Sequence, residues 1–335
     1  MDWNTLDWDV LDRLRATFLS DARTAGPYWH TLTDLECYDL TYGERIGWKW
    51  DAVLAELRRR GWQPPAAATL LDWGCGSGIA GRRVAARFGA QTARLVLHDH
   101  SSLAMDFAEH RARRLGAPFS VERATTRFLR EAPVDVLLLS HVVNELDDAG
   151  RAELGELLER ATTVLWVEPG THEVSRALVG WRERWLAAGG HVVAPCTHAA
   201  PCGLLVPGNE RHWCHFFASP PPEIFANSEW VRFGQRAGID LRALPYSFLV
   251  LDRRPHAWPA GTSRILGEPR VYKGYAKIFA CDDSGVAELT LQQRADKTLF
   301  KSLKRAHGPL IYRWTREGEK ICGAERFLGP APDSA

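Results

Sequence analysis

The feature that most constrains the fold of this chain is a glycine-rich turn between an apolar strand and a helix. The apolar approach ends at Leu70 and Leu71, the turn is DWGCGSG (72–78), and the helical segment IAGRRVAARFG follows. Glycines let the backbone come close to a ligand, and the helix N-terminus adds a positive dipole. The segment therefore predicts a ligand-binding strand–turn–helix unit.

Three further apolar segments extend this unit into a sheet. ARLVLHD ends at Asp99, VDVLLLS covers 134–140, and TVLWVEPG covers 163–170. Strands alternating with helices predict a doubly wound α/β domain, whose ligands bind at the carboxyl ends of the strands. Asp99 lies 21 residues beyond Gly78. An acidic side chain there can accept hydrogen bonds from both ribose hydroxyls of a bound nucleoside.

The pattern D-x-G-x-G-x-G differs from the dinucleotide pattern G-x-G-x-x-G and resembles motif I of class I S-adenosylmethionine (SAM)-dependent methyltransferases. The resemblance implies that Asp72 lies near the methionine amino group through water and that Asp99 binds the ribose. It also implies that three glycines shape the pocket floor: Gly74, Gly76 and Gly78. A NAD-type domain and a ligand-free Rossmann-like domain are the alternatives. The segment SVERATTRF offers no clear acidic partner for the adenine, so that contact is unassigned.

A methyl-transfer apparatus is not evident, and the catalytic residues are unknown. The segment SHVVNEL (140–146) lacks the Asn/Asp-Pro-Pro-aromatic motif of amino-group methylators. Pro195-Cys196 and Pro201-Cys202 come too late in the chain for the nucleophile of a carbon-5 pyrimidine methylator. His141 and Glu145 are candidate general bases, with capping or helix-face roles as the alternative.

Three of the seven cysteines fall within 19 residues of a Pro/Gly-bearing loop, at Cys196, Cys202 and Cys214. Thiolates that converge in such a loop are typical ligands of a metal or an iron–sulfur cluster. Burial as small apolar residues is the alternative. Cys281, in AKIFACDDSG, is the candidate fourth ligand. The spacing is unlike the C-x2-C pairs of zinc ribbons, which leaves cluster and zinc both open.

Charge and composition restrict the partners and the compartment. Formal net charge is +1, so RNA binding must come from local patches, and neither a membrane nor DNA is expected as a partner. Four aspartates in the first twelve residues exclude a signal or transit peptide, and no apolar run approaches a membrane span. The odd, clustered cysteine count favours a reducing compartment, so we expect a cytoplasmic protein.

The chain divides into three predicted regions. Residues 1–65 form an N-terminal helical region with amphipathic helices over 4–20 and 44–60. Residues 66–258 form the methyltransferase-like domain, with a cysteine-rich insertion at 190–218. Residues 259–335 form a small β-rich module like an OB-fold. The segment from Arg294 to Lys320 contains eight Lys or Arg and only three Asp or Glu, so it is a candidate RNA-contacting surface.

Several segments together resemble the family of the mitochondrial small-ribosomal-subunit methyltransferase-like protein 17 and its bacterial relatives. They are LLDWGCGSG, LLLSHVVNEL, WVEPGTHE, APCTHAAPCGLL, HWCHFF, YSFLVLDRR and SRILGEPRVYKG. The resemblance implies a class I methyltransferase fold and a role in small-subunit assembly and translation with rRNA as partner. It also implies a 4Fe-4S cluster, whose four ligands carry over onto Cys196, Cys202, Cys214 and Cys281. Gly203 and a longer spacer before Cys214 depart from the family pattern.

Two hypotheses of different class follow. In the first, the chain is a small-subunit assembly and translation factor with a SAM-binding domain and a 4Fe-4S cluster. In the alternative, it is an active SAM-dependent methyltransferase acting on rRNA or ribosomal protein. A third hypothesis is a small-molecule methyltransferase with a structural zinc.

Overall fold

The computed structural model describes residues 2–20, 28–116, 118–304 and 308–327, which form two compact units. The first unit comprises residues 1–54, 63–167 and 219–244, and the second comprises 55–62, 168–218 and 245–335. The domain boundaries expected after residues 65 and 258 remain a prediction about the chain.

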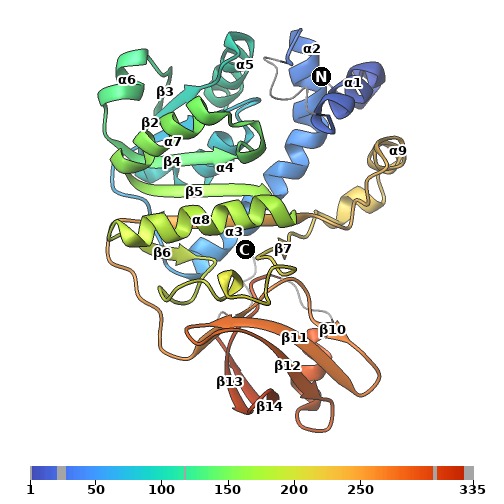
Figure 1. Cartoon of the computed structure of the whole chain (residues 1–335). Helices are drawn as coiled ribbons and strands as arrows, with labels where there is room; N and C mark the ends of the chain where they lie inside the picture. Colours follow the sequence, from blue (N-terminus) through green and yellow to red (C-terminus); the bar gives the residue numbers. More distant parts are fainter. Residues whose placement is uncertain (1, 21–27, 117, 305–307, 328–335) are drawn as a thin grey trace. The chain divides into compact units, whose positions relative to one another are not determined.

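The first unit contains a parallel sheet whose strands follow the order β3-β2-β1-β4-β5 (Figure 1). The strands are β1 (Ala68–Trp73), β2 (Thr92–His98), β3 (Ser120–Arg123), β4 (Val134–Ser140) and β5 (Ala161–Pro169). Every residue of β1 is buried, as expected of a central parallel strand with both faces covered. The α/β prediction and its apolar strand segments are confirmed.

Helices connect these strands and precede them. The connecting helices are α4 (Ile79–Phe88), α5 (Ser102–Arg113), α6 (Thr126–Glu131) and α7 (Asp148–Arg160). Before the sheet come α1 (Trp8–Phe18), α2 (Leu32–Tyr38), the π-helical turn η3 (Asp39–Gly43) and α3 (Glu44–Arg59). Helix α9 (Ser228–Ala237) completes the unit. The two predicted N-terminal helices are thus present as α1 and α3.

Helix α3 stops where its sequence predicts. Gly61 has a φ of +68°, which a side-chain-bearing residue rarely adopts, and the Trp62 N–H donates back to the Leu57 carbonyl. Upstream in the helix, Trp48 and Trp50 are buried, so both serve packing as expected. No helix in the described part of the chain is long and apolar enough to span a membrane.

The second unit contains a short antiparallel group of strands and a helix. Strand β8 (Pro245–Asp252) pairs with β6 (His191–Ala194) and with β7 (Phe216–Phe217), and α8 (His172–Ala187) precedes β6. Strand β8 contains most of the segment YSFLVLDRR, one of those that carry the family resemblance. Short 3-10 turns complete both units: η1 (Trp3–Thr5), η4 (Gly89–Gln91), η5 (Val143–Glu145), η6 (Gly203–Leu205) and η7 (Pro222–Phe225).

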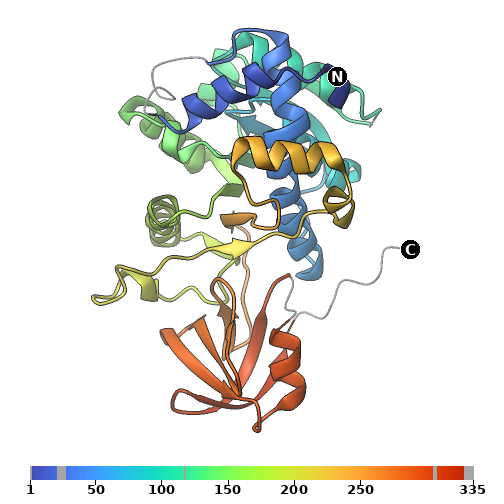
Figure 2. The same ribbon diagram turned by 90° about the vertical axis from the view of Figure 1, so that its right-hand side faces the viewer.

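The C-terminal strands of the second unit form a closed barrel (Figure 2). They are β9 (Thr262–Ile265), β10 (Arg270–Val271), β11 (Tyr275–Asp282), β12 (Gly285–Gln292), β13 (Ile311–Glu317) and β14 (Lys320–Arg326), with α10 (Lys297–Leu303) after β12. Strand pairing runs β9-β11-β12-β14-β13 and returns to β9, and β12 and β14 are parallel. A five-stranded ring with this helix position is the topology of an OB-fold, as predicted.

A buried ionic network joins three segments of the second unit. Both carboxylate oxygens of Glu56 contact the Arg264 guanidinium, and Arg60 contacts the same carboxylate. Arg264 also donates to the Pro195 carbonyl at 3.2 Å, next to Cys196. Burial alone would raise the Glu56 pKa, but Arg264 and Arg60 outweigh it and lower this pKa to about 2. The network therefore fixes the start of the cysteine-rich insertion.

We predict that Glu56→Gln lowers the free energy of unfolding by about 3–5 kcal/mol, because it leaves two buried arginines with one neutral partner. The stabilisation by Glu56 is present above its ordinary pKa of 4.5 and is lost as pH falls from there toward 2. Urea unfolding at several pH values measures both effects. The control is Glu325→Gln, which breaks an exposed pair with Arg313 and should cost less than about 1 kcal/mol. Equal effects of the two substitutions would contradict the prediction.

Candidate functional site

The glycine-rich turn lies at the carboxyl end of β1, where parallel α/β sheets bind their ligands. Gly74, Gly76 and Gly78 have φ values of +72°, +50° and +75°. A Cβ at Gly74 would lie 2.8 Å from Val142, and one at Gly78 would lie 2.7 Å from the Ala108 Cβ. At Gly76, by contrast, no heavy atom lies within 4 Å of the Cβ position. Two glycines therefore permit tight packing, and the third leaves open space that a ligand can enter.

Asp99 holds the turn as well as facing the predicted ribose position. Its Oδ2 accepts a hydrogen bond from the Gly76 N–H at 2.8 Å, and its Oδ1 accepts one from the Ser101 N–H at 2.9 Å. Each carboxylate oxygen has a second lone pair, so hydroxyl groups of a ligand can still donate to it. The structure thus adds a positioning role that the sequence did not reveal.

Asp72 is fully buried and has one unused oxygen. Its Oδ2 accepts from the Gly81 N–H at 2.8 Å, while Oδ1 has no hydrogen-bond partner among the described residues. Burial raises the Asp72 pKa to about 7, with Asp99 adding to the rise and the Gly81 bond opposing it. Such a buried acceptor costs stability unless a donor arrives. The residue fits the amino group of a SAM molecule, which would supply that donor.

Aromatic residues that precede α2 lie close to the same region. The Tyr28 hydroxyl donates to Glu145 Oε1 at 3.4 Å, and the Tyr28 pKa is raised by burial and by Glu145, Tyr38 and Asp99. Leu14, Trp29 and Leu35 pack with Ala104 and Phe107 of α5 in one buried cluster. The sequence predicted the helix that contains Leu14, but it predicted neither α2 nor the packing of these residues on α5.

His141 follows β4 in a conformation that side-chain-bearing residues rarely adopt, with a φ of +59°. Its Nε2 lies 3.4 Å from the Lys49 Nζ, and burial and Lys49 together hold the His141 pKa well below its usual range. A neutral imidazole at the end of a central strand can accept a proton. Nearby, the Cys75 pKa is raised well above the ordinary value by burial, which fits packing rather than nucleophilic attack.

The four predicted ligand cysteines line one cavity in the second unit. Cys196, Cys202 and Cys214 come from the insertion, and Cys281 lies on β11. Burial raises the Cys281 pKa well above the ordinary value, and the thiols of Cys196, Cys214 and Cys202 add to this rise. The open space among the side chains is small, about 30 Å³. The structure brings these residues together, and their role as ligands stays a prediction.

The sulfurs are not arranged for a single ion. Among the described residues, no group of three or more His, Cys, Asp or Glu side chains has the geometry to hold one metal ion. A tetrahedral zinc site needs sulfurs at about 2.3 Å from one point. The remaining cysteines are elsewhere in the chain: Cys37 and Cys75 are buried, and Cys322 is exposed.

Buried donors surround the thiols. The Arg182 Nε donates to Cys196 Sγ at 3.2 Å, and its Nη2 donates to the carbonyls of His198 and Ala200. The His198 Nε2 lies 3.4 Å from Cys281 Sγ. Burial lowers the Arg182 pKa, but Cys196 outweighs it and the net shift is upward. A buried guanidinium therefore lies against the Cys196 sulfur, while burial disfavours negative charge on Cys202, Cys214 and Cys281.

Side chains of α8 and β8 support the insertion, which has little regular structure of its own. Ser175 and Ser247 both donate to the Cys214 carbonyl at 2.7 Å, and Arg176 donates to the Leu204 and His212 carbonyls. At Gly203, where the sequence departs from the family pattern, close packing against β12 leaves no room for a side chain. A Cβ at Gly203 would lie 2.7 Å from the Val286 nitrogen of β12.

The chain matches the family model described as mitochondrial small ribosomal subunit Rsm22 over residues 50–314. No curated protein matches the chain. It is similar to magnesium protoporphyrin IX methyltransferase from Synechocystis PCC 6803 with bound SAH, at 14% identity, TM-score 0.39, and coverage of 73% of this chain and 100% of that one. It is also similar to a SAM-dependent methyltransferase from Thiobacillus denitrificans in complex with S-adenosyl-L-homocysteine. The identity is 17%, the TM-score is 0.33, and the match covers 70% of this chain and 97% of that one. At these values the neighbours say nothing about reaction or substrate.

We predict that Asp72→Asn stabilises the protein at pH 8 and leaves its stability unchanged below pH 4. An acid whose folded pKa is raised loses stability as pH rises from its ordinary value, 3.8, through about 7. This difference corresponds to at most about 4 kcal/mol, from about 1.4 kcal/mol per unit. Urea unfolding across this pH range measures it, with the exposed Asp148→Asn as control. A destabilised Asp72→Asn variant at pH 8 would contradict the prediction.

Proposed function

The chain belongs to the mitochondrial small ribosomal subunit Rsm22 family, and we propose that it is an assembly and translation factor of the small ribosomal subunit that binds rRNA. The observation that carries this proposal is the family match over residues 50–314, which includes both candidate sites. Consistent with a bacterial relative of that family, the proposed location is the cytoplasm.

The proposed ligand of the glycine-rich turn is SAM. When bound, SAM supplies a methyl group on a sulfonium. In this proposal the unused oxygen of Asp72 accepts from the methionine ammonium, and Asp99 accepts from the ribose. Gly76 leaves the turn open to the ligand, and Asp99 keeps the turn in place through the Gly76 N–H. The support for SAM is this unsatisfied acceptor beside an open glycine turn.

The proposed occupant of the cysteine cavity is a 4Fe-4S cluster held by Cys196, Cys202, Cys214 and Cys281. The donor set fits, because four thiols meet there with buried Arg182 beside them. Since the open space is only about 30 Å³, cluster insertion must move the thiol side chains apart. The cluster then ties β11 of the barrel to the insertion.

The proposed rRNA-contacting surface includes the outer face of α10. Lys297 and Lys301 are exposed on α10, Lys304 is exposed at its C-terminal end, and Arg294 is exposed in the turn before it. Basic residues clustered along one helix are typical of contact with phosphates. Arg305, which belongs to the same basic stretch of sequence, lies outside the described residues.

Methyl transfer to rRNA or ribosomal protein is the second candidate function. The observation in its favour is His141, a half-buried, neutral imidazole in a left-handed backbone conformation. Strained residues of this kind concentrate at functional sites, where surrounding structure maintains the strain. In this candidate, His141 accepts a proton from the methyl acceptor.

We predict that protein purified without air is brown, with broad absorption near about 400 nm and matching amounts of iron and acid-labile sulfide. Cys196→Ser should remove most of the colour and iron, because it removes one ligand. The matched control is Cys322→Ser, which changes an exposed cysteine of β14 in the same unit and should keep both. Colourless protein with stoichiometric zinc would overturn the cluster.

We predict that the protein sediments with immature small subunits in ribosome profiles, because assembly factors leave before the subunit matures. Cells without the gene should accumulate such particles. Protein found only in the free pool would count against the assembly role.

The same particles serve to test the second candidate function. A methyl mark on rRNA or ribosomal protein that disappears in a His141→Gln strain would support methyl transfer.

A further inference from the structure

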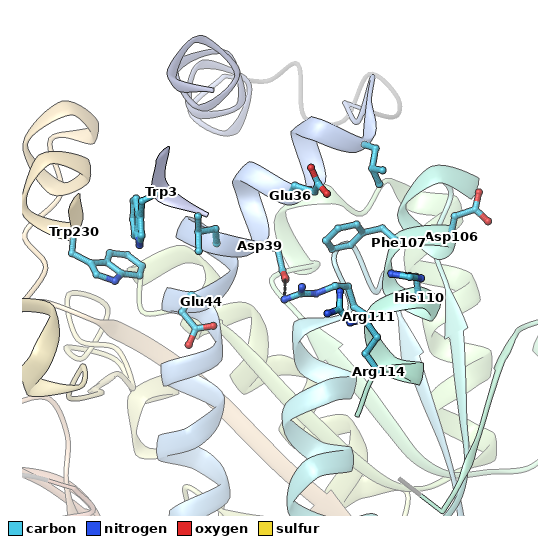
Figure 3. Close-up of a pocket in the computed structure, with 12 residues that line it drawn as sticks. Trp3, Glu36, Asp39, Glu44, Asp106, Phe107, His110, Arg111, Arg114 and Trp230 are labelled. Atoms are coloured by element: carbon cyan, nitrogen blue, oxygen red, sulfur yellow. Dashed lines mark ion pairs between the residues drawn. The ribbon is translucent and has the colours of Figure 1, made fainter. Parts of the chain in front are cut away.

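A cavity of about 550 Å³ lies in the first unit, apart from the glycine turn. Its volume is within the range of ligand pockets, roughly 300–1,000 Å³. The end of α5 forms one side, and η1 and α9 form the other, with residues of α2, η3 and α3 between them (Figure 3). Neither the glycine-turn residues nor the cysteines line it.

Two tryptophans form the aromatic side of this cavity. Trp3 and Trp230 make an edge-on ring pair with centroids 5.0 Å apart. Trp230 is buried and also contacts Trp48 and Phe233, so its ring is held in place. Fixed tryptophans offer a stacking surface for a planar group, and base–aromatic stacking contributes about 1–3 kcal/mol per base.

Basic side chains of α5 form the facing side (Figure 3). His110, Arg111 and Arg114 all come from the end of this helix, and all three are exposed. Arg114 has no ion-pair partner in the described parts of the chain, and Arg111 pairs with Asp39 at 3.0 Å. Guanidinium groups so placed can bind a phosphate through charge-assisted hydrogen bonds.

Asp39, which also lines the cavity, is an ion-pair partner that Arg111 can leave when a ligand binds. It lies in the π-helical turn, a kind of irregularity that is frequent at functional sites. Asp39 is buried and also pairs with Arg82, which is itself buried. If Arg111 turns toward a ligand, Asp39 keeps Arg82 as its counter-ion, so no buried charge is left alone.

The acidic residues at the cavity restrict the kind of ligand. Glu36, Glu44 and Asp106 also line it, and they would repel a ligand that carried many phosphates. They would instead accept hydrogen bonds from amino and hydroxyl groups. The combination favours a planar, hydrogen-bonding group that carries one phosphate.

We propose that this cavity binds one nucleotide of single-stranded RNA, with the base against Trp3 and Trp230 and the phosphate on Arg111 and Arg114. The choice of RNA over a free nucleotide rests on the proposed function, whereas the recognition of a nucleotide rests on the cavity itself. Arg82 contacts both the cavity and the glycine-rich turn. It pairs with Asp39 of the cavity, and its Nη1 donates to the Ser77 carbonyl of the turn at 2.6 Å.

The test is calorimetric titration of the full chain with a 5′-phosphorylated tetraribonucleotide, with AMP, and with tetralysine. The tetraribonucleotide should bind, and Arg111→Gln combined with Arg114→Gln should weaken it by about tenfold or more, since two charge-assisted contacts are lost. Trp3→Leu should weaken it by a similar factor. The matched control, Arg113→Gln, removes an arginine of the same helix that pairs with Glu109 outside the cavity lining, and should leave affinity unchanged.

Three results would overturn the proposal: no binding of either the tetraribonucleotide or AMP, equal loss in the Arg113→Gln control, or binding of tetralysine alone. Binding of AMP without the tetraribonucleotide would overturn the assignment to RNA. Circular dichroism verifies that each variant folds. Absence from immature small subunits with intact tetraribonucleotide binding would refute the proposed function alone. Normal sedimentation of a wild-type protein that binds no tetraribonucleotide would refute this inference alone.

Discussion

The second unit depends on the buried carboxylate of Glu56. It draws together the end of α3, the first strand of the barrel through Arg264, and the start of the cysteine-rich insertion through the Pro195 carbonyl. One carboxylate faces two guanidiniums, so the network carries excess positive charge. Arg264 lines the cysteine cavity together with Arg182. The buried cations that organise the fold thus also compensate the negative charge that thiolate ligands would bring.

The insertion changes how the barrel can be used. OB-folds bind nucleic acid on the face of their second and third strands, here β11 and β12. In this chain, His212 packs on Phe279 of β11 with ring centroids 4.4 Å apart, and Gly203 packs against the β12 backbone. The protein's own insertion therefore covers that end of the face, whereas the lysines of α10 are exposed.

Sequence predicted local features well, because each has a local cause. DWGCGSG predicted the glycine turn, apolar runs predicted β1, β4 and β5, and the amphipathic pattern over 44–60 predicted α3. The charged networks were not predictable in this way. Glu56 and Arg264 lie 208 residues apart, and the unused oxygen of Asp72 depends on how α4 packs. The role of Asp39 in the π-helical turn was not predictable either, because its ion pairs with Arg82 and Arg111 are tertiary contacts.

Two charged side chains hold the backbone of the glycine turn in place through hydrogen bonds. Asp99 holds the Gly76 N–H, and Arg82 holds the Ser77 carbonyl while Asp39 anchors Arg82. Preorganisation of this kind reduces the entropy that binding would otherwise cost. Asp39 also pairs with Arg111 of the α5 cavity, so a single buried carboxylate contacts both the arginine that holds the glycine turn and an arginine of that cavity.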